Sequence, residues 1–152
     1  MPIIVTEPTG TIQPVVQARL ADLLDACLDE FPVRLRDPDI RREYVGKLSA
    51  LAVVVEYQEE DQVTGAVALY ANDFENRAAF ITMIGVDPAH RRKGIGKTLL
   101  KSAFEYLSKT GFKRVSLSVL RGNPAITLYE AFGFQRVRED DGSVEMVAEV
   151  RS

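Results

Sequence analysis

The sequence predicts a mixed α/β fold, built as one domain over residues 1–152. A chain of 152 residues suits a single domain and buries roughly 68–70% of its unfolded surface. Its 46% hydrophobic and 27% charged residues are typical of a globular protein. Strand-like and helix-like segments alternate in the order βααβββαβαββ. Because this order contains both hairpins and helix crossovers, we expect a sheet with antiparallel and parallel strands.

The first three predicted elements are a strand and two helices. Residues 3–5 form a short apolar strand between two prolines. A helix follows, whose apolar face repeats every three to four residues: Val16, Leu20, Leu23, Leu24, Cys27, Leu28 and Phe31. Cys27 lies on that face, so we interpret it as a packing residue and not as a nucleophile. A second helix begins at Asp37-Pro38, an N-cap followed by proline, with an expected buried stripe of Ile40, Tyr44 and Leu48.

Three strands are predicted next, at residues 52–57, 65–70 and 78–86. The third, AAFITMIGV, is almost continuously apolar, which indicates a central strand covered on both faces. Gly85 stands near its end, where an isolated glycine often marks a β-bulge or a close backbone approach.

The second half of the chain continues the alternation. A helix runs from Ile95 to about Leu107, and Gly111 is its expected stop. A half-buried strand follows at residues 115–119, and Asn123-Pro124 then opens a short helix that Gly133 ends. Two last strands, residues 134–137 and 144–150, surround the acidic turn EDDGS.

Charge and cysteine content exclude several classes of protein. The 19 basic and 22 acidic residues give a net charge of −3, which argues against general nucleic-acid binding. One cysteine cannot form a disulfide within the chain, and one cysteine with one histidine cannot build an ordinary zinc site, so we expect no metal. No apolar run reaches 18 residues and no signal peptide is visible. We therefore expect a cytoplasmic protein without a membrane partner.

The strongest chemical signal is the segment RRKGIGKT, residues 91–98, between a buried strand and a helix. Gly94 and Gly96 allow the backbone to approach a ligand, and the helix N-terminus directs its free N–H groups into the loop. Such a loop suits a phosphate or pyrophosphate. A Walker A motif would need glycine at Arg91, and a dinucleotide motif would need glycine at Leu99. A plain surface loop would not explain five basic residues around a helix N-terminus.

Two motifs carry a resemblance to a known family. Arg91-x-x-Gly94-x-Gly96, after a strand ending IGVDP, resembles the Q/R-x-x-G-x-G/A pyrophosphate loop of the GNAT N-acyltransferase superfamily. The segment from Asn123 to Phe134 resembles the family's later N-x-x-A-x-x-L-Y-x-x-x-G-F pattern. The resemblance is clear from about residue 65 to 137. It implies transfer of an acetyl group from acetyl-CoA to a primary amine of a small molecule, amino sugar or peptide. A non-catalytic acyl-CoA sensor and a P-loop nucleotide-binding protein are the alternatives.

The resemblance also implies roles for individual residues. The pyrophosphate-binding residues would be the loop's first arginine, its backbone N–H groups and one hydroxyl: Arg91, Arg92, Lys93, Gly94, Gly96, Lys97 and Thr98. A bulge near Gly85 would free the backbone groups of Ile84 and Val86 for the pantetheine arm, which Asn123 would also contact. The N–H of Val86 would stabilise the developing oxyanion, and Tyr129 would protonate the leaving thiolate.

The general base and the acceptor stay open at this point. Asp73, Glu75, Glu56 and Tyr70 are candidate bases, and a water chain is an equal alternative. His90 precedes Arg91, where the family often has a packing aromatic, so we interpret it as a packing residue. The acidic turn and the net charge of −3 favour a cationic acceptor. Both a monomer and a homodimer are compatible with the sequence.

Overall fold

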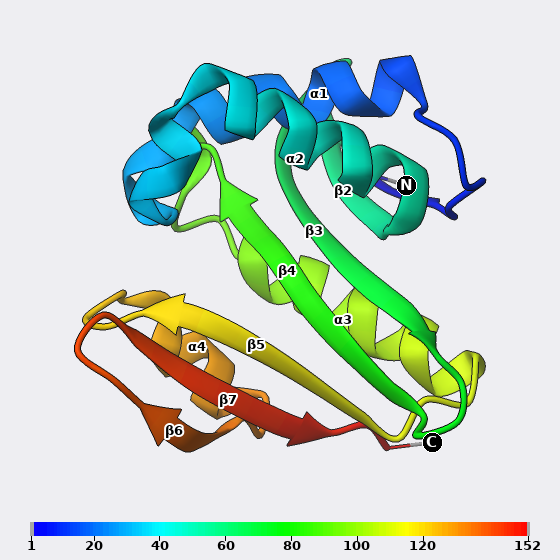
Figure 1. Ribbon diagram of the computed structural model, residues 1–152, viewed down its shortest axis with the longest axis vertical. Coiled ribbons are helices and arrows are strands. Elements are labelled where there is room, and N and C mark those ends of the chain that lie inside the picture. The colour runs from blue at the N-terminus through cyan, green and yellow to red at the C-terminus, as the bar shows by residue number, and fades with distance from the viewer. Residues whose placement is uncertain (1, 152) are drawn as a thin grey trace.

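A computed structural model describes residues 2–151 as a seven-stranded sheet with helices on both faces (Figure 1). The sheet order is β1-β2-β3-β4-β5-β7-β6, and the order of elements along the chain is the predicted one. The strands are β1 (Ile3–Thr6), β2 (Val53–Glu59), β3 (Gln62–Asp73), β4 (Ala78–Val86), β5 (Arg114–Leu120), β6 (Gln135–Glu139) and β7 (Ser143–Glu149). The prediction of a mixed α/β fold is therefore confirmed.

The sheet is antiparallel except at its centre, where β4 and β5 run parallel. These two strands pair over only four residues each, from Ala78–Ile81 on β4 to 114–117 on β5. Beyond that point they diverge, and Figure 1 shows the two strands meeting at one end and separating toward the other. The separation leaves the last part of β4 paired on one side only, with β3.

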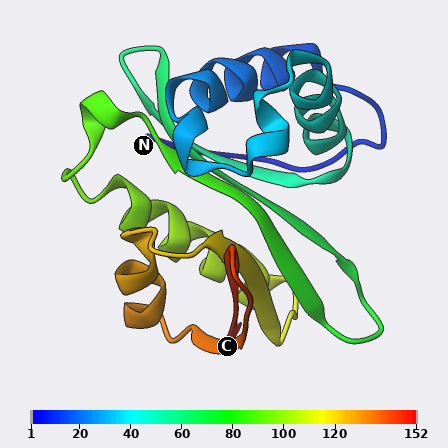
Figure 2. The same ribbon diagram turned by 60° about the vertical axis from the view of Figure 1, so that its left-hand side comes forward.

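Helices α1 (Pro14–Ala26) and α2 (Pro38–Leu51) cover one face of the sheet (Figure 2). The prediction of one helix continuing to Phe31 is wrong, because α1 ends at Ala26 and two 3₁₀ turns follow, η1 (Leu28–Glu30) and η2 (Val33–Arg36). Ile40, predicted to be buried, is 40% exposed, and Val45 is buried in its place. The helix face therefore lies further along α2 than the apolar pattern indicated.

Helices α3 (Ile95–Lys109) and α4 (Ala125–Ala131) lie on the opposite face. Gly65 on β3 is required there, since a Cβ added to it would lie 2.8 Å from Ile95 Cγ2. This close approach fixes the first turn of α3 against the sheet. Both predicted stops are confirmed: Gly111 and Gly133 follow the ends of α3 and α4 with φ of 84° and 95°.

The β-bulge expected near Gly85 lies instead at Thr82. Ala68 pairs with Met83 and Leu69 with Ile81, so Thr82 is the extra residue, whereas Gly85 keeps regular register with Ala66. Gly85 has a packing role: a Cβ there would lie 3.0 Å from the sulfur of Cys27. Gly85 is therefore explained by the close approach of the segment after α1 and not by a β-bulge.

Candidate functional site

A cleft of about 500 Å³ opens where β4 and β5 diverge. Its walls come from six segments of the chain: the turns after α1, Tyr44 of α2, strand β4, strand β5, the α4 segment, and the β6–β7 turn. Its polar lining includes Glu30, Arg34, Tyr44, Thr82, Asn123 and Tyr129. The apolar strand β4 and the segment that begins at Asn123 therefore meet at this cleft, although they are far apart along the chain.

The backbone of β4 is open toward this cleft. The N–H of Asp87 donates to the carbonyl of Thr64 on β3 (2.8 Å), which makes these two residues a hydrogen-bonded pair. Backbone direction alternates along a strand, so Ile84 and Val86 direct their N–H and C=O groups away from β3. Since β5 has already diverged, no neighbouring strand pairs with them on that side.

Tyr44 supports the bulge from α2. Its hydroxyl lies 2.8 Å from the carbonyl oxygen of Thr82 and 2.9 Å from the Thr82 hydroxyl. Burial raises the pKa of Tyr44 above its usual value, so the phenol stays protonated and can donate. The sequence analysis placed Tyr44 in a buried stripe and missed this contact, since a helical period says nothing about a hydroxyl's partner.

The glycine loop adopts the conformation that its sequence indicates. Gly94 caps α3 in the left-handed region, with φ of 76°, and Arg92 also has a positive φ of 67°. Gly96 lies in the first turn of α3, where an added Cβ would be 3.3 Å from Leu128 Cδ2. The Thr98 hydroxyl donates to the carbonyl of Gly94 (3.0 Å). To donate to a ligand the Thr98 hydroxyl would have to give up this bond, and its expected role as a hydroxyl donor stays a prediction.

The side chain of Arg91 turns back from the loop toward β4. Its Nε donates to the carbonyl of Val86 (3.2 Å), and its guanidinium forms an ion pair with Glu30 on η1. Arg92, Lys93 and Lys97 are exposed around the helix N-terminus. Arg91 thus joins the glycine loop to the cleft, a contact that the sequence analysis did not foresee.

Tyr129 and Asn123 both line the cleft from the α4 segment. Tyr129 is 3% exposed and packs edge-on against Phe134, with ring centroids 5.9 Å apart. Within residues 2–151 every fully buried side-chain N or O atom has a hydrogen-bond partner. The Tyr129 hydroxyl has no such partner, so it is not fully buried, and Tyr129 lines the cleft. Burial raises its pKa far above the usual value, so the phenol is neutral. Asn123 Oδ1 accepts from the N–H of Ala125 (2.8 Å), which leaves its amide NH₂ for other partners.

None of the four candidate bases from the sequence lines the cleft. Glu56 is fully buried and binds Arg19 through both carboxylate oxygens, at 2.8 and 2.9 Å. Asp73 accepts hydrogen bonds from Asn76, which lower its pKa, in the hairpin at the closed end of the β4–β5 pair. Glu75 belongs to the same hairpin, and Tyr70 on β3 packs near Lys47. His90 is near Glu59 and Lys93 and does not line the cleft.

Cys27 is a core residue, as predicted. It is 3% exposed, and its thiol donates to the carbonyl of Leu23 (3.2 Å). Burial raises its pKa to about 11, and the nearby Arg91 offsets this only in part. A thiol in that state is a poor nucleophile at neutral pH.

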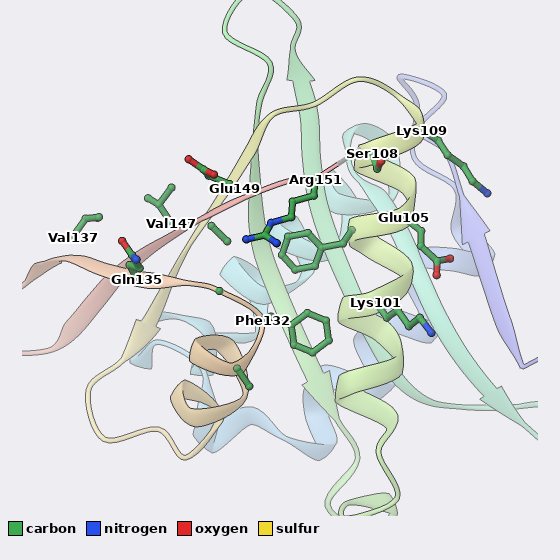
Figure 3. Close-up of a pocket in the computed structure, with 14 residues that line it drawn as sticks. Lys101, Glu105, Ser108, Lys109, Phe132, Gln135, Val137, Val147, Glu149 and Arg151 are labelled. Atoms are coloured by element: carbon green, nitrogen blue, oxygen red, sulfur yellow. The ribbon is translucent and has the colours of Figure 1, made fainter.

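A larger hollow of about 1090 Å³ lies between α3, α4 and the β6–β7 edge. In Figure 3 Phe132 and Arg151 lie between α3 and the β6–β7 edge, whereas Lys109 and Glu105 point away from them on the other side of α3. Like the cleft, this hollow has no lining residue from the segment 91–98, and unlike the cleft it is lined by neither Asn123 nor Tyr129. Over residues 2–151 no group of three or more His, Cys, Asp or Glu is arranged to hold a metal ion. No helix in the same range has the length and apolar character to cross a membrane.

Comparison with known proteins identifies the family. The model of the acetyltransferase (GNAT) family matches residues 18–134. An uncharacterised N-acetyltransferase of Bacillus subtilis, YsnE, is 36% identical over 80 residues, which are 51% of this chain and 52% of that protein. The spermine/spermidine N(1)-acetyltransferase of the same organism is 35% identical over 80 residues, 51% of this chain and 53% of its own length. The matched region thus spans about half the length of these curated relatives.

Solved structures share the fold over nearly the whole chain. A protein of Desulfovibrio desulfuricans assigned to the GNAT family superposes with a TM-score of 0.77 at 17% identity, covering 98% of this chain and 99% of that one. The PaiA N-acetyltransferase of Thermoplasma acidophilum, solved with coenzyme A, has a TM-score of 0.73 at 18% identity with the same coverage. The predicted resemblance is confirmed, and this chain belongs to the GNAT acetyltransferase family.

Proposed function

We propose that this protein transfers the acetyl group of acetyl-CoA to a primary amine by direct attack of the amine on the thioester. One observation carries the proposal: the unpaired backbone edge of β4 ends beside a glycine loop at a helix N-terminus. A strand edge suits the amide-containing pantetheine arm, and the helix N-terminus suits the pyrophosphate. Both parts of one ligand therefore find complementary groups in a continuous path.

The loop residues fit the anionic part of acetyl-CoA. The N–H groups of Arg92, Lys93, Gly94, Gly96 and Lys97 would hold the pyrophosphate, and the exposed basic side chains would add an attraction that salt screens. Gly96 supports this placement, because only side-chain ends lie near its missing Cβ. The fold alone therefore gives no strong reason for a glycine there, whereas close approach of a ligand does.

Ile84, Val86 and Asn123 would bind the pantetheine arm. Ile84 and Val86 offer N–H groups that point away from β3, on the side where β5 has diverged, and Asn123 offers its amide NH₂. The Val86 N–H would also stabilise the oxyanion that develops on the thioester carbonyl. A preorganised donor of this kind contributes about 3–4 kcal/mol to the transition state in other enzymes.

Tyr129 would protonate the sulfur as the C–S bond breaks and the C–N bond forms. Its burial keeps the phenol neutral, which is the state that a proton donor needs. Cys27 would take no part, since its thiol is buried and protonated. Direct attack without an acetyl-enzyme is the mechanism that these two residues support.

The acceptor would be a small amine, an amino sugar or a peptide amine. One relative in the comparison is a spermine/spermidine acetyltransferase, which favours a small cationic amine. The acceptor would enter from the side of η1, η2 and the β6–β7 turn, because these segments form the remaining walls of the cleft.

Thermal stability with acetyl-CoA, with Mg·ATP and with neither ligand tests the proposal. A ligand at about 100 times its Kd adds roughly 2.7 kcal/mol, a rise of roughly 5–11 °C for a protein of this size. We expect the rise with acetyl-CoA only, followed by thiol release when amines are added. Binding without thiol release from any amine would favour the sensor alternative, and a response to ATP alone would refute the acetyl-CoA site.

A further inference from the structure

The cleft has only one carboxylate among its lining residues in the range 2–151, and it belongs to Glu30. An aliphatic amine arrives mostly as an ammonium ion, since its pKa is near ~10. Removing a cation from water without a counter-charge is costly, so an acceptor site requires an anion or several acceptors. The other full charge lining the cleft is the exposed Arg34, which repels ammonium. Glu30 is therefore the one side chain there that offers an ammonium group a full negative charge.

Glu30 is held close to the open edge of β4. Its N–H donates to the carbonyl of Cys27 (3.1 Å), and that of Phe31 donates to Leu28 (3.1 Å), which closes the η1 turn. Cys27 and Phe31 are buried and pack over Gly85, whose missing Cβ would lie 3.0 Å from Cys27 Sγ and 3.4 Å from Phe31 Cζ. The turn that carries Glu30 thus rests directly on the β4 segment proposed to hold the thioester.

Arg91 connects this carboxylate to the glycine loop. Its guanidinium pairs with Glu30 and also donates to the carbonyl of Val86, while its backbone begins the loop proposed to bind pyrophosphate. The two side chains are 41% and 37% exposed, and ion pairs with this exposure are weak. A diphosphate, which matches the planar guanidinium in two-point contacts, can compete with Glu30 for Arg91.

We propose that Glu30 is the carboxylate that binds the ammonium group of the acceptor, and that Arg91 covers it until acetyl-CoA binds. This inference rests on the proposed function, because it requires a phosphate group at the glycine loop. Acceptor and Arg91 compete for one carboxylate, so a ligand that attracts Arg91 strengthens acceptor binding. By linkage, the acceptor strengthens cofactor binding by the same factor.

Calorimetric titration of amines with and without CoA tests this coupling. CoA carries the phosphates but no acetyl group, so no turnover disturbs the measurement. The probes are spermidine, glucosamine and alaninamide, one for each proposed acceptor class. In the native sequence we expect at least one amine to bind about 10-fold more tightly with CoA present, within the usual range of coupling between sites.

Glu30→Gln removes the charge and keeps the shape. We expect it to weaken binding of that amine to the CoA complex by about 10- to 100-fold, the effect of losing a charged hydrogen bond, and to abolish the coupling. Its affinity for CoA should stay equal or increase, since Arg91 becomes free. The matched control is Asp29→Asn, which changes the same charge one residue away on a fully exposed side chain and should leave both affinities within about 2-fold.

Three results would overturn the inference. Equal amine binding with and without CoA in the native protein would exclude the coupling. Unchanged amine binding in Glu30→Gln would exclude the carboxylate, and weaker CoA binding in that variant would show that Glu30 only positions Arg91 for the cofactor. In all three the CoA site itself remains, so the proposed function stands. Failure of the native protein to bind CoA would instead refute both.

Discussion

The substitution Gly96→Ala tests whether the glycine at position 96 is required for ligand binding or for the stability of the fold. Gly96 is the second residue of α3, and an added Cβ would meet only Leu128 Cδ2 at 3.3 Å and Val86 Cγ2 at 3.9 Å. Both atoms are ends of side chains that can shift by a few tenths of an ångström. Glycine in a helix is about 1 kcal/mol less favourable than alanine, so the substitution should not destabilise the free protein.

The expected magnitudes follow from these contacts. The free variant should melt between no change and about 4 °C higher, because about 1 kcal/mol shifts Tm by 2–4 °C at this size. Acetyl-CoA at about 100 Kd of the native protein should raise the native Tm by roughly 5–11 °C. If the methyl group reduces affinity about 10-fold, the same concentration adds only ~1.4 kcal/mol, a rise of about 3–6 °C. Compared with the native protein, the variant should therefore have an equal or higher Tm without ligand and a smaller rise in Tm with acetyl-CoA.

Differential scanning calorimetry with and without acetyl-CoA measures both quantities. Gly46→Ala is the control, since Gly46 lies within α2, on the other face of the sheet from α3. A Cβ there would be 3.1 Å from Nε2 of Gln17, the end of a flexible side chain. It should behave like Gly96→Ala without ligand and like the native protein with acetyl-CoA. A full acetyl-CoA response in Gly96→Ala would refute the placement of the pyrophosphate at this helix N-terminus.

Three further outcomes are expected. Tyr129→Phe keeps the ring and removes the donor, so thiol release should fall about 100-fold or more while acetyl-CoA binding, followed by calorimetry, stays unchanged. Arg19→Met leaves the fully buried Glu56 carboxylate without its partner, which should lower the free energy of unfolding, measured with urea, by about 3 kcal/mol. Adding Glu56→Leu should recover part of this loss. Cys27 has a folded-state pKa raised to about 11 from a usual 9.0, so stability should fall as the pH rises from about 9 to 11, and iodoacetamide should label it only after unfolding.

The sequence predicted most elements because their signals are local. Proline after an N-cap marked the start of α2, glycines with positive φ marked the ends of α3 and α4, and an unbroken apolar run marked β4. The end of α1 was wrong for a physical reason. Cys27, Phe31 and Leu35 are all buried, so the apolar pattern continues into the two 3₁₀ turns after the α-helix has ended. Burial periodicity reports the contact surface and not the hydrogen-bond pattern of the backbone.

The bulge could not be placed from the sequence for a similar reason. Gly85 was the conspicuous residue in β4, but a glycine is needed there because the sulfur of Cys27 packs against it from the α1 side of the sheet. Thr82 is an ordinary strand residue, and its extra position is supported by Tyr44, which lies far away along the chain. The contact of Glu30 with Arg91 was hidden in the same way, since neither residue's neighbours in sequence point to the other.

The open edge of β4 is chemically uneven, and this bears on the reaction. An unpaired strand edge offers donors and acceptors in equal number. Here two acceptors are already occupied, because Tyr44 donates to the carbonyl of Thr82 and Arg91 donates to that of Val86. Ile84 and Val86 keep N–H groups that point away from β3, and β5 does not pair with them. Among the carbonyls of Thr82, Ile84 and Val86 only that of Ile84 stays open, so free N–H groups outnumber free carbonyls and the edge has excess positive potential. Such an edge favours the carbonyl oxygen of a thioester, and favours it more as negative charge develops there, which is the differential stabilisation that catalysis requires.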